Sequence, residues 1–145
     1  MHFVTGGTFN GKAAWVKNRY CKGKGLTWIS AYRGHSFPHD LGSEDLCVLE
    51  GMELWIKDTL SQEEWRERLE MCMQWEREIT GRQLVVIGSD ITKGIVPIDK
   101  EDRKWRDMTG WVYQDIVKKS ERVDLIWYGI NQQLKYGGME NEDIH

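Results

Sequence analysis

A glycine-rich segment near the amino end constrains the fold more than any other feature of this chain. Residues Gly6–Lys12 read GGTFNGK and lie between a short β-prone run, His2–Thr5, and a helical pattern, Lys12–Tyr20. The spacing G-x-x-x-x-G-K between a strand and a helix is typical of a phosphate-binding loop, in which main-chain N–H groups, a helix amino end and a lysine face an anion. The residues predicted to bind nucleotide phosphates are Gly6, Gly7, Thr8, Phe9, Asn10, Gly11, Lys12 and Ala13. The alternative is a structural glycine-rich turn beside a solvated lysine.

Strand and helix patterns alternate along the rest of the chain. Short apolar runs predict strands, and apolar residues at helical spacing predict helices. The predicted strands are Leu26–Ala31, Leu46–Leu49, Gln83–Gly88, Val123–Tyr128 and an edge strand at Ile130–Tyr136, and the predicted helices are Gly51–Thr59, Ser61–Thr80 and Asp99–Lys119. The alternation predicts a single-domain α/β fold, an open and mostly parallel sheet flanked by helices, of the P-loop nucleotide-binding type. We expect this domain to span residues 1–138 and residues 139–145 to form a polar, frayed tail.

Capping residues mark the ends of the two long helices. Ser61 and Glu64 have the spacing of a capping box, Gly81 is the expected left-handed stop of that helix, and Asp99 caps the next one. The residues predicted to face the core are Trp65, Leu69, Cys72 and Ile79 in the first helix, and Trp105, Met108, Val112 and Ile116 in the second. Most of the eight tryptophans are therefore expected in the core, although an exposed one near a loop edge could stack on a base.

The composition is that of an ordinary globular domain. The chain has 145 residues, 40% of them hydrophobic and 30% charged, with a net charge of −3. A mild acidic excess gives no global attraction to nucleic acid or to an anionic membrane, so neither partner is expected. The three cysteines, Cys21, Cys47 and Cys72, form no metal or disulfide pattern, and no apolar run of about 18 residues occurs. We expect a cytoplasmic protein without a membrane segment.

Two acidic residues follow predicted strands at the edge where a nucleotide would lie. Glu50 comes after the third strand and Asp90 after the fourth, and the carboxyl ends of parallel strands share one edge of a sheet. The position after Lys12, where such a loop has a Ser or Thr that reaches Mg²⁺, is Ala13. Glu50 and Asp90 are therefore the predicted metal-binding and catalytic carboxylates, each able to hold a weakened Mg²⁺ site through water. The alternative for each is a solvated carboxylate at a strand end.

The segment Tyr32–Asp45 is predicted to be an exposed loop, because it has turn-forming residues and no helical or alternating period. Loops of this length in compact domains often carry function. It contains His35 and His39, of which His35 is the stronger candidate for a catalytic role. A solvated loop histidine is the alternative for both.

Three segments resemble the bifunctional adenosylcobinamide kinase and adenosylcobinamide-phosphate guanylyltransferase family of cobalamin biosynthesis. They are VTGGTFNGK at Val4–Lys12, VLEGMELWIKDTL at Val48–Leu60 and SDITKGIVPIDKEDRKWRDMTGWVYQ at Ser89–Gln114. In the third segment, GIVP at Gly94–Pro97 is followed at the family's spacing by Arg106, Asp107, Gly110 and Gln114. This resemblance is more specific than the phosphate loop alone and covers most of the chain.

The resemblance implies an enzyme that uses ATP or GTP to phosphorylate the aminopropanol hydroxyl of adenosylcobinamide, and then transfers GMP to that phosphate through a guanylylated histidine. Glu50 lies where the family usually has Asp, and Asp90 where it has Glu. The family's histidine lies in a longer segment, so His35, in the sequence RGHSFP, is a partial match. Tyr113 replaces an Asn of the family. Assembly into a homo-oligomer is also implied.

Two other functions fit the sequence. A relative that has lost catalysis would bind nucleotide or a partner subunit without turnover, and Ala13 and the short histidine loop favour it. Lys12, the two acids and the GIVP helix favour an active enzyme instead. The third function is that of an unrelated α/β interaction domain whose glycines are structural.

Overall fold

The computed structural model describes residues 1–8, 11–20, 25–91 and 99–137. Within these residues one sheet has six strands: β1 (His2–Gly6), β2 (Leu26–Ser30), β3 (Leu46–Glu50), β4 (Gln83–Ser89), β5 (Arg122–Trp127) and β6 (Ile130–Lys135). Their order is β2-β3-β4-β1-β5-β6, with β1 to β5 parallel and β6 antiparallel to β5 at one edge. The predicted open, mostly parallel α/β sheet is therefore confirmed.

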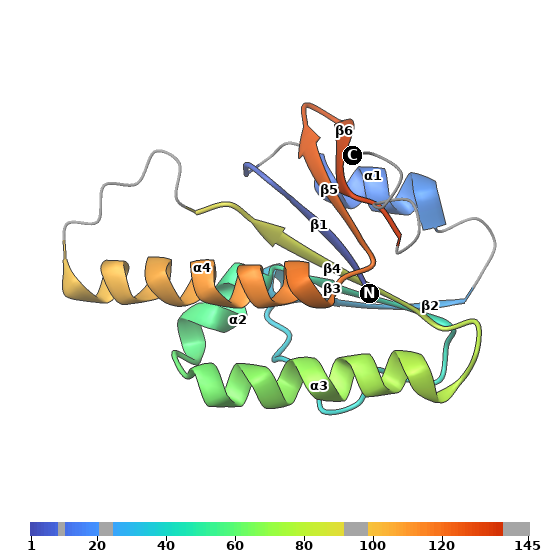
Figure 1. Cartoon of the computed structure of the whole chain (residues 1–145), viewed down its shortest axis with the longest axis horizontal. Coiled ribbons are helices and arrows are strands. Elements are labelled where there is room, and N and C mark those ends of the chain that lie inside the picture. The colour runs from blue at the N-terminus through green and yellow to red at the C-terminus, as the bar shows by residue number, and fades with distance from the viewer. Residues whose placement is uncertain (9–10, 21–24, 92–98, 138–145) are drawn as a thin grey trace.

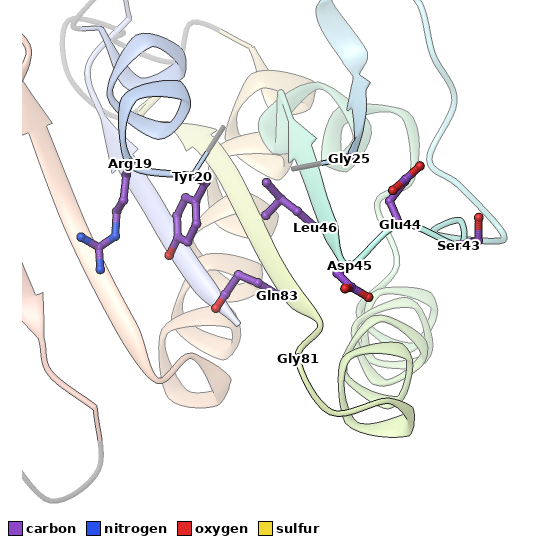
Figure 2. Close-up of a pocket in the computed structure, with 9 residues that line it drawn as sticks. All are labelled: Arg19, Tyr20, Gly25, Ser43, Glu44, Asp45, Leu46, Gly81 and Gln83. Carbon is purple, nitrogen blue, oxygen red and sulfur yellow. The ribbon is translucent and has the colours of Figure 1, made fainter. Parts of the chain in front are cut away.

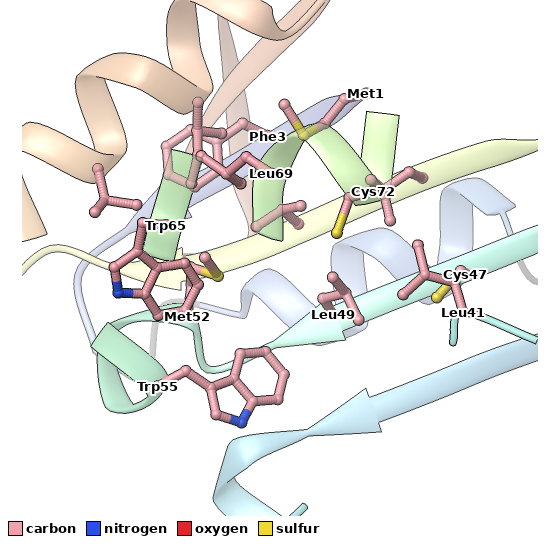
Figure 3. Packing of buried hydrophobic residues seen from close by; sticks show 14 of the residues in the cluster. Met1, Phe3, Leu41, Cys47, Leu49, Met52, Trp55, Trp65, Leu69 and Cys72 are labelled. Carbon is pink, nitrogen blue, oxygen red and sulfur yellow. The ribbon is translucent and has the colours of Figure 1, made fainter. Parts of the chain in front are cut away.

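Helices cover both faces of this sheet. The helix α1 (Lys12–Tyr20) lies on one face, and α2 (Met52–Asp58), α3 (Gln62–Glu78) and α4 (Lys100–Lys119) lie on the other (Figure 1). The larger hydrophobic cluster fills the space between the sheet and α2, α3 and α4, and it contains Phe3 of β1 together with Trp65 and Leu69 of α3 (Figure 3). A smaller cluster that contains Val4 and Val16 lies under α1. Alternate residues of β1 thus enter the two clusters.

The carboxyl end of α3 differs from the prediction. The helix begins after Ser61, whose hydroxyl accepts the N–H of Glu64 at 3.3 Å, as expected for the capping box. It ends at Glu78, short of the predicted end, because Ile79 already has an extended backbone. Ile79 is therefore half-exposed and not part of the core. Gly81 has a positive φ of 97°, but it lies in the turn that follows the helix.

The loop between β2 and β3 is more buried than predicted. A short 3₁₀ helix, Ala31–Arg33, follows β2. Further along, Leu41 is fully buried, and the Phe37 ring meets the Trp55 and Trp65 rings edge to face, with centroids 5.3 Å and 5.2 Å away. The expectation of an exposed loop is therefore wrong for Phe37 and Leu41, which close one side of the core, and correct for residues 32–36.

Two cysteines are buried within the described residues. Cys47 and Cys72 are free thiols, and burial raises the pKa of each to about 12, which fits small buried hydrophobic residues rather than reactive groups. Cys21 and the predicted tail lie outside the described residues. No helix in the part of the chain that the structure covers is long and apolar enough to cross a membrane.

The backbone of β1 approaches β5 very closely at Gly6. A Cβ atom on Gly6 would collide with the carbonyl oxygen of Ile126, and the φ of Gly6, 146°, is one that L side chains rarely adopt. The Gly6 carbonyl also accepts the N–H of Asp90, at the end of β4, at 2.8 Å. Gly6 therefore lets the chain leave the sheet between its two neighbouring strands and enter the glycine-rich loop.

We expect Gly6→Ala to destabilise the fold by about 3 kcal/mol, because the new methyl group overlaps main-chain atoms of a neighbouring strand. Gly110→Ala in α4 is the matched control. Nothing outside its own helix backbone lies within 4 Å of that Cβ position, so the substitution should stabilise the helix by about 0.5–1 kcal/mol. Urea unfolding measures both free energies. Similar values for the two variants would mean that the close approach at Gly6 imposes no constraint.

Candidate functional site

A cavity lies beside the glycine-rich loop at the carboxyl edge of the sheet. It has a volume of about 500 Å³ and lies where the ends of β3 and β4 meet the start of α1. Its lining residues are Thr8, Gly11, Lys12, Ala13, Ala14, Tyr32, Glu50, Ile87 and Ser89. The structure thus brings Glu50 to the same cavity as four of the residues predicted to bind phosphate. Phe9 and Asn10 lie outside the described residues.

Lys12 provides a buried cation in this cavity. Its side chain is 7% exposed, and its Nζ donates to the carbonyl of Gly7 at 2.7 Å. Burial lowers the pKa of Lys12, and the nearby Glu53 and Glu50 act in the opposite direction. A bound phosphate would replace the neutral Gly7 carbonyl with an anionic acceptor, which favours the charged ammonium. Lys12 is therefore placed to bind an anion that enters the cavity.

A buried hydrogen-bond network that was not predicted from the sequence supports the floor of the cavity. Glu53, in the first turn of α2, is buried, and its carboxylate accepts the N–H of Ser89 at 2.9 Å and the hydroxyl proton of Tyr32. The Tyr32 hydroxyl also lies 3.3 Å from that of Ser89. Burial, followed by the hydrogen bond to Glu53, raises the pKa of Tyr32, so this hydroxyl stays protonated. The network holds the end of β4, the 3₁₀ helix and α2 together.

The two predicted acids line different cavities. The half-buried Glu50 accepts the indole N–H of Trp28 at 3.1 Å and faces the Lys12 cavity. Asp90 lines a cavity of about 570 Å³ between α4 and the strands β1 and β5. Within the described residues no group of three or more His, Cys, Asp or Glu side chains could hold a metal ion. Because Mg²⁺ often binds one or two carboxylates together with substrate phosphates and water, Glu50 is the better-placed ligand beside Lys12.

The two loop histidines lie away from the Lys12 cavity. His35 is exposed, and its Nδ1 accepts the main-chain N–H of Ser30 at 3.0 Å. With Nδ1 as the acceptor, the neutral ring carries its proton on Nε2, so Nε2 has no free lone pair in this arrangement. His39 lines a separate cavity of about 220 Å³ together with Arg68 of α3. The structure therefore brings neither histidine to the phosphate loop.

A further cavity of about 500 Å³ lies at the opposite edge of the sheet, at the amino ends of β3 and β4 (Figure 2). Its lining residues are Arg19, Tyr20, Gly25, Ser43, Glu44, Asp45, Leu46, Gly81 and Gln83. In Figure 2 the Arg19 side chain points away from Glu44 and Asp45, so the charged groups do not converge on one point. Only the cavity at the carboxyl edge therefore combines a glycine-rich loop with a buried lysine, among the residues that the structure describes.

Tyr113 lies where the resemblance leads us to expect Asn, and it has a structural role. Its hydroxyl donates to the carbonyl of Ser89 at 2.7 Å, and a Cβ atom on Gly88 would collide with it. The Tyr113 ring also meets the Phe3 ring edge to face, with centroids 5.1 Å apart. Tyr113 thus ties α4 to the end of β4 and supports the edge of the sheet that carries the site.

Known relatives place the chain in a family. The chain matches the family described as "Cobinamide kinase / cobinamide phosphate guanyltransferase" over residues 33–134. The chain belongs to this family. A curated relative, the bifunctional adenosylcobalamin biosynthesis protein CobP of Pseudomonas aeruginosa, is 28% identical over 96 residues, which cover 61% of this chain and 53% of that protein. This chain therefore spans about half the length of that curated relative.

The family match and the phosphate loop are separate lines of support. The matched range begins at Arg33, so it includes Glu50 and Asp90 but not Lys12. The GIVP sequence at Gly94–Pro97, on which the resemblance depends strongly, is inside the matched range but outside the residues that the structure describes. The assignment of Lys12 therefore depends on its motif and on the geometry of its cavity.

We expect Glu53→Ala to lower the free energy of unfolding by about 3 kcal/mol, because it leaves the buried Ser89 N–H and Tyr32 hydroxyl without their acceptor. Glu50→Ala is the matched control, with an expected loss below about 1 kcal/mol, since this carboxylate is only partly buried. Chemical denaturation measures both. Glu53→Gln keeps a carbonyl acceptor for Ser89 and should recover part of the loss. Equal losses in the two alanine variants would contradict a structural role for Glu53.

Proposed function

We propose that this chain binds ATP or GTP through the loop Gly6–Ala13 and transfers a phosphoryl group from it to the hydroxyl of a cobinamide. The placement of Lys12 carries this proposal, because its buried ammonium and the Glu50 carboxylate line one cavity at the carboxyl edge of a parallel sheet. Membership of the cobinamide kinase / cobinamide phosphate guanyltransferase family supports the choice of acceptor. Adenosylcobinamide is the acceptor that the sequence resemblance favours.

The chain's own groups would act mainly by position and charge. Lys12 and the N–H groups of the loop would bind the terminal phosphates, and the amino end of α1 would add its partial positive charge. Phosphoryl transfer requires little covalent chemistry from a protein, so groups that align the phosphate and stabilise its charge can supply most of the catalysis. The hydrogen bonds that Tyr32 and Ser89 donate to Glu53 would hold the floor of the cavity in place.

The residues around the loop fit a bound Mg²⁺ only in part. Mg²⁺ would neutralise charge on the transferred phosphate. Glu50 would hold it through water beside the nucleotide phosphates, while Ala13 offers no hydroxyl. Asp90 stays a proposed catalytic carboxylate on the α4 side of the loop, where the acceptor could approach through the cavity that Asp90 lines. The metal site is therefore proposed to be weak.

The guanylyl step requires His35 to change its hydrogen bonding. His35 is the proposed guanylyl acceptor, and attack of its Nε2 on the α-phosphorus of GTP would form an N–P bond and release pyrophosphate. Before this attack the ring would have to give up the Ser30 N–H and move its proton from Nε2 to Nδ1. A relative that binds nucleotide without turnover is therefore the second candidate function, favoured by this hydrogen bond and by Ala13.

We expect ATP or GTP with Mg²⁺, at about one hundred times its dissociation constant, to stabilise the folded chain by about 2.7 kcal/mol. Lys12→Ala should remove this gain, because it deletes the cation that faces the phosphates. Lys104→Ala, which removes an exposed lysine from α4, is the matched control and should keep it. Thermal unfolding with and without nucleotide measures the shift for each variant. An unchanged shift in Lys12→Ala would exclude the loop as the phosphate site.

The guanylyl step predicts a covalent adduct. Incubation with GTP labelled at the α-phosphate should leave a label on the protein that is stable in base and labile in acid, as expected for a phosphoramidate. His35→Ala should lose the label and His39→Ala should keep it. Transfer of the γ-phosphate to adenosylcobinamide, measured in parallel, tests the kinase step. Nucleotide binding with neither a label nor phosphate transfer would favour the relative without turnover.

A further inference from the structure

The turn between β5 and β6 exposes an unusual pair of aromatic rings. Trp127 is 64% exposed and Tyr128 is 78% exposed, and their rings stack with centroids 5.9 Å apart and an angle of 27° between their planes. Ile130, which pairs with Trp127 across the hairpin, is also exposed. Most of the aromatic residues that the structure describes are at least partly buried. An exposed apolar patch of this kind marks a surface that binds something.

The aromatic pair lies next to the phosphate loop. A Cβ atom on Gly11 would lie 3.4 Å from the Cα of Gly129, so the residue that follows Tyr128 is packed against the last glycine of the loop. At the other end of the loop, Gly6 approaches the carbonyl of Ile126, which precedes Trp127. The loop is therefore close to the end of β5 at its first glycine and to the β5–β6 turn at its last glycine.

The strand order shows on which side of the loop the Lys12 cavity and the aromatic pair lie. β1 and its loop lie between β4 and β5, with β3 beyond β4. The Lys12 cavity lies on the side of β3 and β4, and the aromatic pair lies on the side of β5. A nucleotide with its terminal phosphate near Lys12 and Glu50 that runs across the loop toward β5 would have its base over the end of β5.

The backbone of the turn is suited poorly to a tyrosine. Tyr128 has a φ of 52° and is the one non-glycine residue with positive φ in the described part of the chain. Gly129 has a φ of 77°, and a two-residue hairpin turn with two positive φ values favours Asn or Gly at the first position. A tyrosine at this position costs stability, which indicates that the ring serves a purpose other than forming the turn.

A hollow beside the pair has room for a flat ring system. It has a volume of about 310 Å³ and is lined by Leu125, Trp127, Tyr128, Ile130, Asn131 and Gln132. One of the polar side chains in this lining is already engaged, because the Asn131 amide donates to Asp124 at 3.0 Å. Apolar and aromatic atoms form much of the remaining surface. Such surfaces bind bases by stacking, and because every base has a π face this binding is tolerant of base identity.

We propose that Trp127 and Tyr128 form the base-binding platform for the nucleotide whose phosphates occupy the Gly6–Ala13 loop. This proposal rests on the proposed nucleotide binding and adds to it the site of the base. The platform contacts the substrate directly and contributes affinity for the aromatic part of ATP or GTP, while the loop contributes affinity for the phosphates.

Calorimetry on the full chain with ATP, GTP and inorganic tripolyphosphate, each with Mg²⁺, tests the platform. Trp127→Ala should weaken both nucleotides roughly tenfold, because loss of a stacking aromatic costs about that much, and should leave the affinity for tripolyphosphate unchanged. Trp127→Phe should recover most of the nucleotide affinity. Ile79→Ala, which truncates an exposed apolar residue at the end of α3, is the control and should change nothing.

Tyr128→Asn supplies a second, independent measurement. It removes the ring and suits the positive φ better, so nucleotide affinity should fall while the melting temperature holds or rises. Unchanged nucleotide affinity in Trp127→Ala and Tyr128→Asn, or an equal loss for tripolyphosphate, would overturn the platform. Trp127→Ala could instead change the mass measured by sedimentation and leave the nucleotide affinities unchanged. The patch would then be a contact with a second copy of this chain, and the platform would also be overturned.

The same titrations separate this proposal from the one on which it rests. Wild-type binding of tripolyphosphate that matches its binding of ATP would reject the platform and keep the phosphate loop. Absence of binding for all three probes would reject the loop, and the platform with it.

Discussion

The contact between Gly6 and the carbonyl of Ile126 determines how the chain leaves the sheet at the edge that carries the candidate site. Because no side chain fits between the two strands, β1 turns out of the sheet directly into the loop. Lys12 then follows at the start of α1 and donates to Gly7, which keeps its ammonium within the loop's cavity. A bulkier residue at position 6 would move the loop away from β5. The loop, the acid at the end of β3 and the aromatic turn share one edge because β1, β3 and β5 are parallel, and Gly6 lets the loop stay close to β5.

The fold was predictable to the extent that burial leaves a pattern in the sequence. The strands Leu46–Glu50 and Gln83–Ser89 are covered on both faces, so they read as continuous apolar runs and were found with an error of one residue at the carboxyl end. Phe37 and Leu41 were assigned to an exposed loop because two isolated apolar residues have no period. Their burial results from packing against α2 and α3, which lie later in the chain.

The site was predictable only where a local motif defines it. The loop and Lys12 follow from seven consecutive residues, and the structure gives them a cavity that Glu50 shares. Glu53 was missed because its hydrogen bonds reach residues 21 and 36 positions away, and nothing near it in the sequence indicates a buried acid. Trp127 has the pattern of a strand residue, yet it is exposed because it ends β5, where this strand extends beyond the cover of α4.

The position of β1 in the middle of the sheet also affects how the chain reaches this structure. His2 pairs in register with Val85 of β4 and with Arg122 of β5, so the first of the six strands has partners that lie much later in the chain. Such distant pairing slows folding, since the entropy of closing long loops is lost before the contacts form. During translation the apolar residues of β1 have no strand partner until β4 leaves the ribosome, and they lack their second partner until β5 follows, which exposes them to aggregation and to chaperones.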